Sequence, residues 1–387
     1  MAQWSMTPVI DWLLHEGRHI AAPDALVGDL CARVRDAGMP IDRVAFFFGT
    51  LHPQYFGIAM HWDGTSVRIL KASFQMRETD EVRSSPARRI TEGERVIRRR
   101  LERADCPADF QVLEELRAAG MTDYVIAEVV FGNGGRNSVS LATRRPGGFS
   151  DHDIIEVQRL LHPFGMAMEI HVGRALSKTL LETYLGRISG SRVLDGQIKR
   201  GDGQSIDAVI WFSDLRESTP LSASLGEQRF LELLNDYFAA TAGAVLEHGG
   251  EVLRFIGDAS LAVFPTAGES ARTVCERAVD AARAARLRVQ ASNAARLGAG
   301  LPAFACGVGL HLGRVYYGNI GTPERLEFSV IGVAANKAAR IEALCKDTGQ
   351  DVVLSASMAA ELGAPCRSLG KFALRGVAEP EEVFALP

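Results

Sequence analysis

Alternating and continuous apolar segments predict five strands in the first part of the chain. "VAFFFGTL" and "YFGIAMHWDG" read as strands, and Asp63-Gly64 predicts a hairpin turn into "TSVRILKASF". "TDYVIAEVVFG" and "SVSLATRR" form a later β-rich pair, with "NGGRN" as the turn between them. The Arg-rich segment "ARRITEGERVIRRRLER" has a helical period, and a solvated helix face is favoured over a phosphate-binding patch.

A long amphipathic helix is predicted after these strands. Ser150 or Asp151 is placed to cap its first turn, and apolar residues then recur at spacings of three and four as far as Leu181. This stripe suits a helix that packs on its own domain and also against a partner helix, with a kink near Pro163. The Gly- and Ser-rich residues 186–205 predict a linker and a domain boundary near 200.

A different order of elements begins at residue 207. "DAVIWFSD" predicts a strand, a long amphipathic helix ends at Gly249-Gly250, and "EVLRFIGDASLAVFP" predicts two short strands around a turn. An Ala/Arg-rich helix, the strands "FACGVGLHLG" and "LEFSVIG", the helix "AANKAARIEALCKDTG" and further short strands follow. This β-α-β-β-α-β order predicts a ferredoxin-like α+β arrangement.

Composition narrows the class of protein. The 387 residues suggest two domains, and a net charge of −4 gives no basic field for nucleic acid. No apolar run reaches the roughly 18 residues of a membrane span, and the first residues lack the pattern of a secretory signal. The six cysteines lack CxxC pairs, which argues against a zinc site and a disulfide framework. We therefore expect a cytoplasmic protein.

Two aspartates carry the first indication of chemistry. Asp214 and Asp258 each end an apolar strand-like segment, and a strand–helix–hairpin connection can bring both to one sheet edge. Two carboxylates there would repel each other unless a cation lies between them, and hard oxygen ligands suit magnesium or manganese. Either aspartate alone could equally be a turn-capping acid, but the pair favours a metal site.

Four segments together resemble a known family. "FSDLRESTPLS", "GGEVLRFIGDASLAVFP", "GVGLHLGRVYYGNIG" and "RLEFSVIGVAANKAARIEALC" occur in the order and spacing of the class III nucleotidyl cyclase homology domain. Members of that family make cyclic nucleotides from nucleoside triphosphates. The resemblance covers residues 205–387 and implies that Asp214 and Asp258 bind two divalent ions, Mg²⁺ or Mn²⁺, with the backbone carbonyl of Leu215.

The resemblance also implies roles for residues around the metal pair. Backbone N–H groups in the stretch containing Glu217, Ser218 and Thr219 would face the triphosphate. Asn336 and Arg340 match the family's transition-state pair, and their spacing of four places them on one helix face. The amide would orient the ribose, and the guanidinium would neutralise charge on the α-phosphate. Arg375 stands where the family often has a lysine that contacts the terminal phosphates.

Base choice in this family depends on two positions, here Arg254 and Ser329. Arg254 keeps a donor for a ring nitrogen, and Ser329 can donate or accept at the exocyclic group. Neither matches the glutamate and cysteine typical of guanylate-forming members, so ATP is favoured. A guanylate cyclase or one with relaxed specificity is the alternative, because arginine is not a conservative replacement for the usual lysine. "GVAAN" lacks a common acid, yet the intact metal and transition-state residues argue against a silent nucleotide-binding domain.

The family's sites combine residues of two protomers, so the resemblance implies a homodimer with two composite sites. Residues 1–170 more weakly resemble a GAF-type α/β sensor domain, and residues 171–204 would form a helical signalling linker before the catalytic domain at 205–387. An unknown small-molecule effector of the sensor is expected. The exit helix would couple the state of the sensor to the placement of two cyclase domains.

Overall fold

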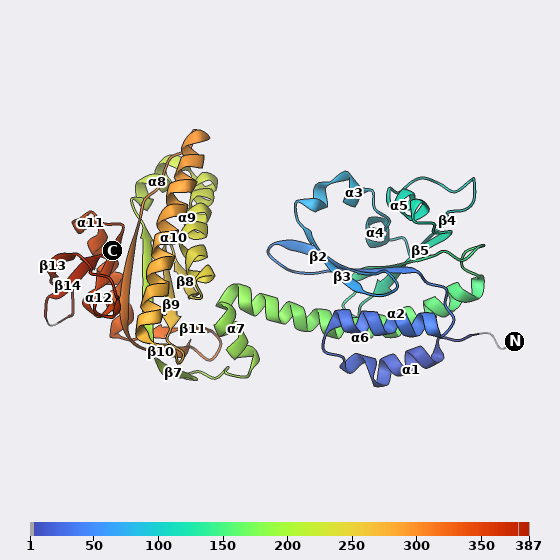
Figure 1. Cartoon of the computed structure of the whole chain (residues 1–387), viewed down its shortest axis with the longest axis horizontal. Helices are drawn as coiled ribbons and strands as arrows, with labels where there is room; N and C mark the ends of the chain where they lie inside the picture. The colour runs from blue at the N-terminus through green and yellow to red at the C-terminus, as the bar shows by residue number, and fades with distance from the viewer. Residues whose placement is uncertain (1–3, 378, 387) are drawn as a thin grey trace. The chain divides into compact units, whose positions relative to one another are not determined.

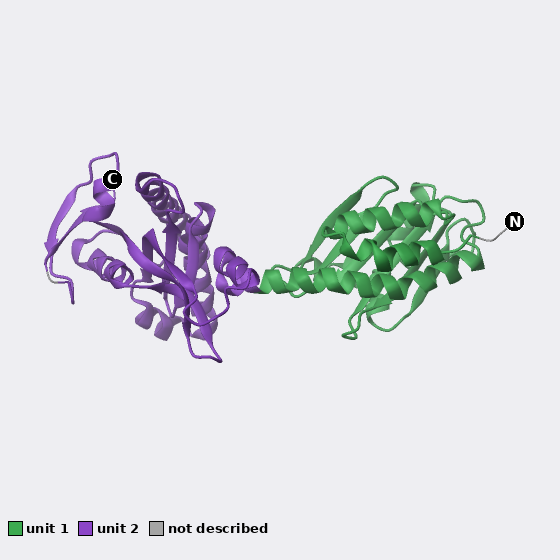
Figure 2. Cartoon of the chain, turned by 90° about the horizontal axis from the view of Figure 1, so that it is seen from below, with its two compact units in different colours: residues 1–180 green, residues 181–387 purple. Residues whose placement is uncertain are grey.

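The computed structural model describes residues 4–377 and 379–386. The chain divides into two compact units, Met1–Leu180 and Leu181–Pro387, shown in different colours in Figure 2. The division falls inside one long helix, α6 (Asp151–Leu185). The finer assignment of sensor, linker and catalytic segments stays a prediction.

The first unit is built on an antiparallel sheet. Its six strands lie in the order β3-β2-β1-β6-β5-β4. Their bounds are β1 (Arg43–Gly49), β2 (Tyr55–Trp62), β3 (Val67–Ser73), β4 (Val96–Arg100), β5 (Asp123–Val130) and β6 (Arg136–Thr143). The predicted hairpin at Asp63 is confirmed, because its Oδ1 accepts hydrogen bonds from the backbone N–H groups of Thr65 and Ser66.

Helices cover the two faces of this sheet differently (Figure 1). On one face lie α1 (Thr7–His15), α2 (Pro23–Asp36) and α6, with the short η1 (Gly17–His19), and they share a large apolar core with Val44, Phe46 and Phe48 of β1. On the other face lie the short elements η2 (Met76–Glu78), α3 (Asp80–Arg83), α4 (Pro86–Thr91) and α5 (Val112–Ala118). The second face therefore has a thinner apolar layer, centred on α4, α5 and β4–β5.

One helix prediction in this unit is wrong. The Arg-rich segment forms only α4 before Gly93, and Val96–Arg100 is then the edge strand β4, paired antiparallel with β5. Ile97 explains the outcome, because its side chain is buried in the core with that of its strand partner Ile126, and Arg98 pairs with the buried Asp123 of β5. Tertiary pairing overrides the helical period here.

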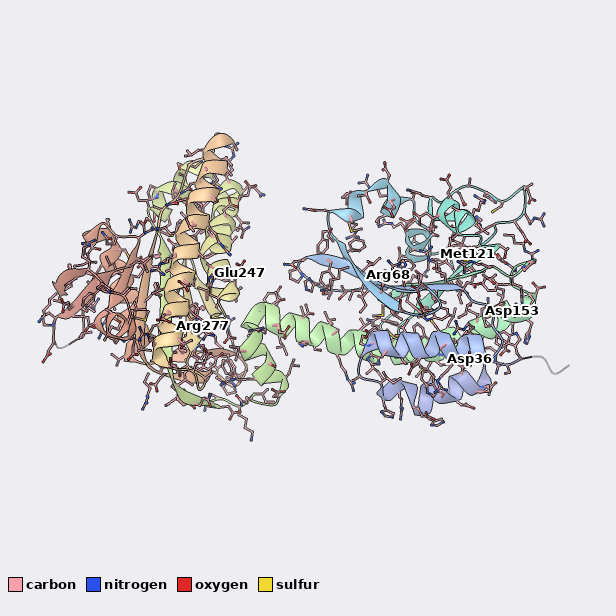
Figure 3. All side chains as sticks on the ribbon, in the orientation of Figure 1. Asp36, Arg68, Met121, Asp153, Glu247 and Arg277 are labelled. Atoms are coloured by element: carbon pink, nitrogen blue, oxygen red, sulfur yellow. The ribbon has the colours of Figure 1, made fainter. Side chains whose placement is uncertain are left out.

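The long helix after β6 is confirmed. Ser150 caps α6, because its Oγ accepts a hydrogen bond from the N–H of Asp153. Asp153, labelled in Figure 3, also accepts from the N–H of Ser150 at 2.8 Å and forms an ion pair with Arg145. The helix is continuous from Asp151 to Leu185, with Pro163 inside it.

The second unit is built on a mixed sheet of eight strands. The order is β13-β14-β12-β10-β7-β9-β8, with β11 paired to β10. The bounds are β7 (Gly203–Leu215), β8 (Glu251–Ile256), β9 (Ala259–Pro265), β10 (Cys306–Gly321), β11 (Leu326–Ile331), β12 (Val352–Ser355), β13 (Ser368–Phe372) and β14 (Glu381–Ala385). Most strands pair antiparallel, and β10 pairs parallel with β12.

Helices pack on both faces of this sheet, which explains why β7 reads as a continuous apolar run. Val209 and Trp211 of β7 share a core with α9 (Glu227–Glu247) and α10 (Ala271–Gly298), whereas Ile210 packs with α11 (Val333–Thr348). The remaining helices are α7 (Arg187–Leu194), α8 (Ser218–Leu225) and α12 (Ala356–Glu361). The predicted α+β class is confirmed. Among the described residues, none of the helices is long and apolar enough to cross a membrane.

Candidate active site

Asp214 and Asp258 lie at neighbouring strand ends in the second unit. Asp214 is the penultimate residue of β7 and pairs with Ala259, the first residue of β9. Asp258 lies in the turn between β8 and β9, after Gly257, whose φ of +62° suits the tight reversal. The N–H of Leu215 donates to the carbonyl of Asp258 at 3.3 Å, which joins the two strand ends directly.

The electrostatics of this pair are unfavourable without a cation. Asp214 is half-buried, and its Oδ1 has no hydrogen-bond partner among the described residues. Burial is the main factor that raises the pKa of Asp214, and the charge of Asp258 raises it further. A carboxylate oxygen that is buried, unpaired and next to a second acid is a donor atom suited to a hard divalent ion.

A third carboxyl group, from Glu342 of α11, lies close to this pair. Its side chain is 9% exposed and packs against Gly307 of β10, which pairs with Asp214. Burial and then the charge of Asp214 raise the pKa of Glu342 to about 7. Across residues 4–377 and 379–386, no group of three or more His, Cys, Asp or Glu side chains is arranged to hold a metal ion. Glu342 therefore interacts with the charge of Asp214 but is not counted with the aspartate pair as a third metal ligand.

The chain after Asp214 turns sharply into α8. Glu217 has a left-handed backbone with φ +57°, and α8 begins at Ser218 with no side-chain cap. The N–H groups of Ser218 and Thr219 are in the first turn, where an α-helix leaves its N–H groups without intrahelical partners. These two N–H groups are available to an anion that lies beside the Asp214 strand end.

Asn336 and Arg340 lie one turn apart on α11. Asn336 is exposed and Arg340 is half-buried, whereas Ala334 and Ala338 face the core. Within the described part of the chain, neither polar side chain makes a hydrogen bond or an ion pair. The guanidinium of Arg340 lies beside the turn that carries Arg375, because a Cβ on Gly376 would lie 3.4 Å from its Nη1. Arg375 itself is exposed.

Arg254 lies on β8 and Ser329 on β11, two strands that are not paired with each other in the sheet but meet at Glu327. Arg254 forms an ion pair with Glu327 of β11, and Ser329 is two residues further along the same strand. Residues two apart in a strand project from one face, so the structure places Arg254, Glu327 and Ser329 in one cluster. Ser329 is only 2% exposed.

Comparison with known proteins identifies the fold around these groups. Residues 202–386 match the family model described as the adenylate and guanylate cyclase catalytic domain. This part of the chain is a class III nucleotidyl cyclase domain.

Relatives of the cyclase domain include named adenylate cyclases. Adenylate cyclase 1 of Rhizobium meliloti (strain 1021) is 30% identical over 173 residues, 45% of this chain and 25% of that protein. The adenylate cyclase of Anabaena cylindrica is 33% identical over 175 residues, 43% of this chain and 33% of that protein. The chain thus spans a quarter to a third of the length of these two relatives.

A solved structure supports the fold of the cyclase domain. A bacterial light-regulated adenylyl cyclase aligns with a TM-score of 0.50 at 18% identity, covering 67% of this chain and 85% of that chain. Members of the family generally use divalent metal ions, bind nucleotide substrates and typically dimerise.

The geometry adds two residues to those that the sequence indicated in the cyclase domain. The sequence does not single out these residues, because Glu327 fits an alternating strand and Glu342 fits an amphipathic helix. A weak signal existed for Glu342, because it is an acid on the buried side of α11, beside Ile341 and Cys345.

Proposed function

We propose that the chain is an adenylate cyclase that converts ATP to 3′,5′-cyclic AMP and pyrophosphate at a homodimer interface. The observation that carries this proposal is the unpaired buried oxygen of Asp214 beside Asp258, within a matched cyclase domain. Carboxylates in this state are costly unless they hold a cation, and two metal ions can stabilise both the attacking and the leaving oxygen of an in-line displacement at phosphorus.

Asp214, Asp258 and the backbone carbonyl of Leu215 would hold two divalent ions, Mg²⁺ or Mn²⁺. Bound there, the ions would activate the ribose 3′-hydroxyl and stabilise charge on the α-phosphate and the leaving pyrophosphate. The N–H groups of Ser218 and Thr219 would bind phosphate oxygens of the same nucleotide.

Asn336 and Arg340 would complete the site of the partner protomer. Both side chains make no hydrogen bond or ion pair within the described residues, so both are available to a ligand. The amide would orient the ribose. The guanidinium would donate hydrogen bonds to the oxygens of the α-phosphate as their charge develops, and Arg375 beside it would contact the terminal phosphates.

The cluster around Arg254 would select the base. The buried hydroxyl of Ser329 can accept from the amino group of adenine, and Arg254 can donate to a ring nitrogen. Glu327 supports GTP as the second candidate substrate, because its carboxylate is an acceptor that the N–H groups of guanine could use. ATP remains the proposed substrate because Arg254 holds this carboxylate in an ion pair.

The first unit would regulate the cyclase domain through α6. This helix has its first turns in the core of the first unit and its last turn in the second unit. A composite site is sensitive to small shifts at its interface, so a change carried by a shared helix can alter turnover.

A direct assay tests the proposed function. The purified chain is incubated with ATP or GTP and either Mg²⁺ or Mn²⁺, and cyclic AMP, cyclic GMP and pyrophosphate are quantified by chromatography. We expect cyclic AMP and pyrophosphate in equal amounts, faster than cyclic GMP. If cyclic GMP were the main product, the substrate would be GTP and the chain a guanylate cyclase. If neither substrate gave a cyclic nucleotide, the proposal would be overturned.

A further inference from the structure

The first unit contains a large pocket on the sheet face opposite α1, α2 and α6. Its volume is about 530 Å³, and its lining comes from β1, β2, β3, β5 and β6 and from the α3–α5 layer. Figure 1 shows that layer spanning the sheet as short helices. A volume of this size fits a drug-sized organic molecule.

Strand register explains why the pocket exists. Ala45 of β1 pairs with Ser140 of β6, and Phe47 pairs with Ser138 and with Ala59 of β2. Paired residues project from the same face, so small side chains gather in the middle of this face and form the pocket floor. The intervening β1 residues, Val44, Phe46 and Phe48, are large and fill the opposite face against the helices.

The walls of the pocket are aromatic and its floor has hydroxyl groups. His61 packs edge-on against Phe47, with ring centroids 5.9 Å apart. Burial lowers the pKa of His61, and Arg43 and Arg68 lower it further, so this ring is neutral near pH 7. The floor also presents Ser138, which is 1% exposed, and Tyr124, which is 4% exposed.

The charged residues that line the pocket are mainly basic. Five basic side chains (Arg43, Lys71, Arg77, Arg88 and Arg136) face two acidic ones (Glu81 and Glu115). Arg88 pairs with Glu92 at 2.5 Å, and Arg136 pairs with Glu128 at 3.3 Å. Within the described residues, Arg43, Lys71 and Arg77 have no acid within ion-pair distance. Lys71 and Arg77 lie over aromatic rings instead, at 5.3 Å from Tyr55 and 5.7 Å from Phe56.

We propose that this pocket binds an organic anion with a flat apolar body and one carboxylate or phosphate group. The ring system lies on the Ala45–Ala59 floor between Phe47, Phe56 and His61. The acidic group is held by the guanidinium of Arg43, which lines the pocket on the same sheet face as Ala45 and Phe47 and whose fork geometry suits both anions. The inference concerns binding to the first unit and stands independently of cyclase activity.

A pair of fluorescent probes tests the site in the full-length chain. 8-Anilinonaphthalene-1-sulfonate carries the flat body and the acidic group, and N-phenyl-1-naphthylamine is the same body without the charge. Each probe is titrated against wild type and variants, and the dissociation constant is read from fluorescence. Circular dichroism and melting temperature establish that each variant is folded.

Two variants remove the two parts of the site separately. Arg43→Gln should weaken binding of the sulfonate by about tenfold or more, because charge-assisted hydrogen bonds are lost, and should leave the neutral probe within about twofold. Ala59→Trp fills the floor and should weaken both probes by at least about tenfold. Arg100→Gln and Ala118→Trp are matched controls on exposed residues outside the pocket and should change neither affinity.

Competition then distinguishes the two anions. Displacement of the sulfonate by 2-naphthoate assigns a carboxylate ligand, and displacement by naphthyl phosphate assigns a phosphate ligand. The proposal is overturned when neither compound competes, or when Arg43→Gln binds the sulfonate as tightly as wild type. It is equally overturned when Ala59→Trp is folded and binds both probes normally.

Discussion

Two aspartates at strand ends, Asp123 in the first unit and Asp214 in the second, have opposite environments. Asp123 begins β5 and is fully buried, and its carboxylate accepts from Arg98 Nη2 at 2.6 Å. It also accepts from the N–H groups of Tyr124 and Phe149, each at 3.0 Å. Asp214 is half-buried and has an oxygen without any partner in the described chain, beside a second acid.

The contrast separates a structural acid from a functional one. Asp123 replaces its lost hydration with a guanidinium and two backbone donors, so its charge is part of the fold. For Asp214, burial and the charge of Asp258 outweigh the effect of the nearby backbone N–H of Leu215, which donates to the carbonyl of Asp258. A buried acid that the fold leaves unsatisfied is a candidate ligand site, and this difference gives each of the following predictions its direction.

Loss of catalysis is the largest expected effect. Asp214→Ala and Asn336→Ala should each reduce cyclic AMP formation to background, because one removes a proposed metal ligand and the other a proposed transition-state contact. When the two inactive variants are mixed, half of the dimers are mixed and each contains one complete site. Activity should then return to about a quarter of wild type.

Co-purification with two affinity tags establishes that mixed dimers have formed. A tagged mixture of Asp214→Ala with Asp258→Ala is the matched control, because both changes fall in the same half of the site and no complete site can arise. Mixed dimers that remain inactive in the first pairing would exclude the composite site.

Asp123 should show the largest effect on stability. Asp123→Ala leaves the guanidinium of Arg98, which is 22% exposed, without its carboxylate and removes an acceptor from two backbone N–H groups. We expect a loss of about 3 to 5 kcal/mol in the free energy of unfolding of the first unit, measured by urea denaturation.

Asp105→Ala is the control for this measurement, because Asp105 and Arg103 form an ion pair in which both side chains are more than half exposed. It should leave the denaturation midpoint almost unchanged. Equal effects of the two substitutions would remove the distinction between a structural and a surface acid in this unit.

The sequence predicted the elements whose pattern is local. The hairpin at Asp63, the capped start of α6 and the alternation of strands and helices after residue 207 all follow from neighbouring residues. Strand β4 did not follow, because three of its five residues are arginines, which favour a helix, and the pairing with β5 decides the conformation.

The same limit applies to the candidate site, where only residues with a local sequence signal could be predicted. Asp214 and Asp258 each end an apolar segment and lie in a recognisable motif, so a short stretch of sequence was enough to predict each of them as a site residue. Glu342 acts on Asp214 from a helix more than a hundred residues away, and Glu327 meets Arg254 only through strand packing. The pocket in the first unit needs the register of several strands, which no short segment contains.

Metal binding should distinguish the two aspartates by ligand linkage. Saturating Mg²⁺ should stabilise the second unit of wild type by up to about 3 kcal/mol over the protein in chelator, because the ion binds only the folded site. Asp214→Asn should lose most of this gain, and Asp123→Asn should retain it, although the latter protein starts less stable. Melting temperatures with and without Mg²⁺ provide the measurement. A full Mg²⁺ response in Asp214→Asn would place the ion elsewhere.

The smallest effect is the stability of the metal-free protein as a function of pH. Burial and Asp258 raise the pKa of Asp214 above its ordinary value of 3.8, so its carboxyl group favours the folded state only while protonated. That contribution is complete below pH 3.8 and is lost as the pH rises through the raised pKa. Asp214→Asn, which cannot ionise, should therefore be more stable than wild type at pH 7 in chelator. Because the group is half-exposed, we expect a gain below about 1 kcal/mol.

The pH dependence identifies the cause of that gain. The difference in unfolding free energy between Asp214→Asn and wild type should shrink as the pH falls toward 4, since wild type then becomes neutral at this position as well. Asp123→Asn should have the opposite sign at pH 7, because it weakens a carboxylate that Arg98 and two N–H groups stabilise. If Asp214→Asn were instead less stable than wild type at pH 7 without metal, the ionised carboxylate of Asp214 would stabilise the fold, as that of Asp123 does. Its unpaired oxygen would then be no evidence for a metal site.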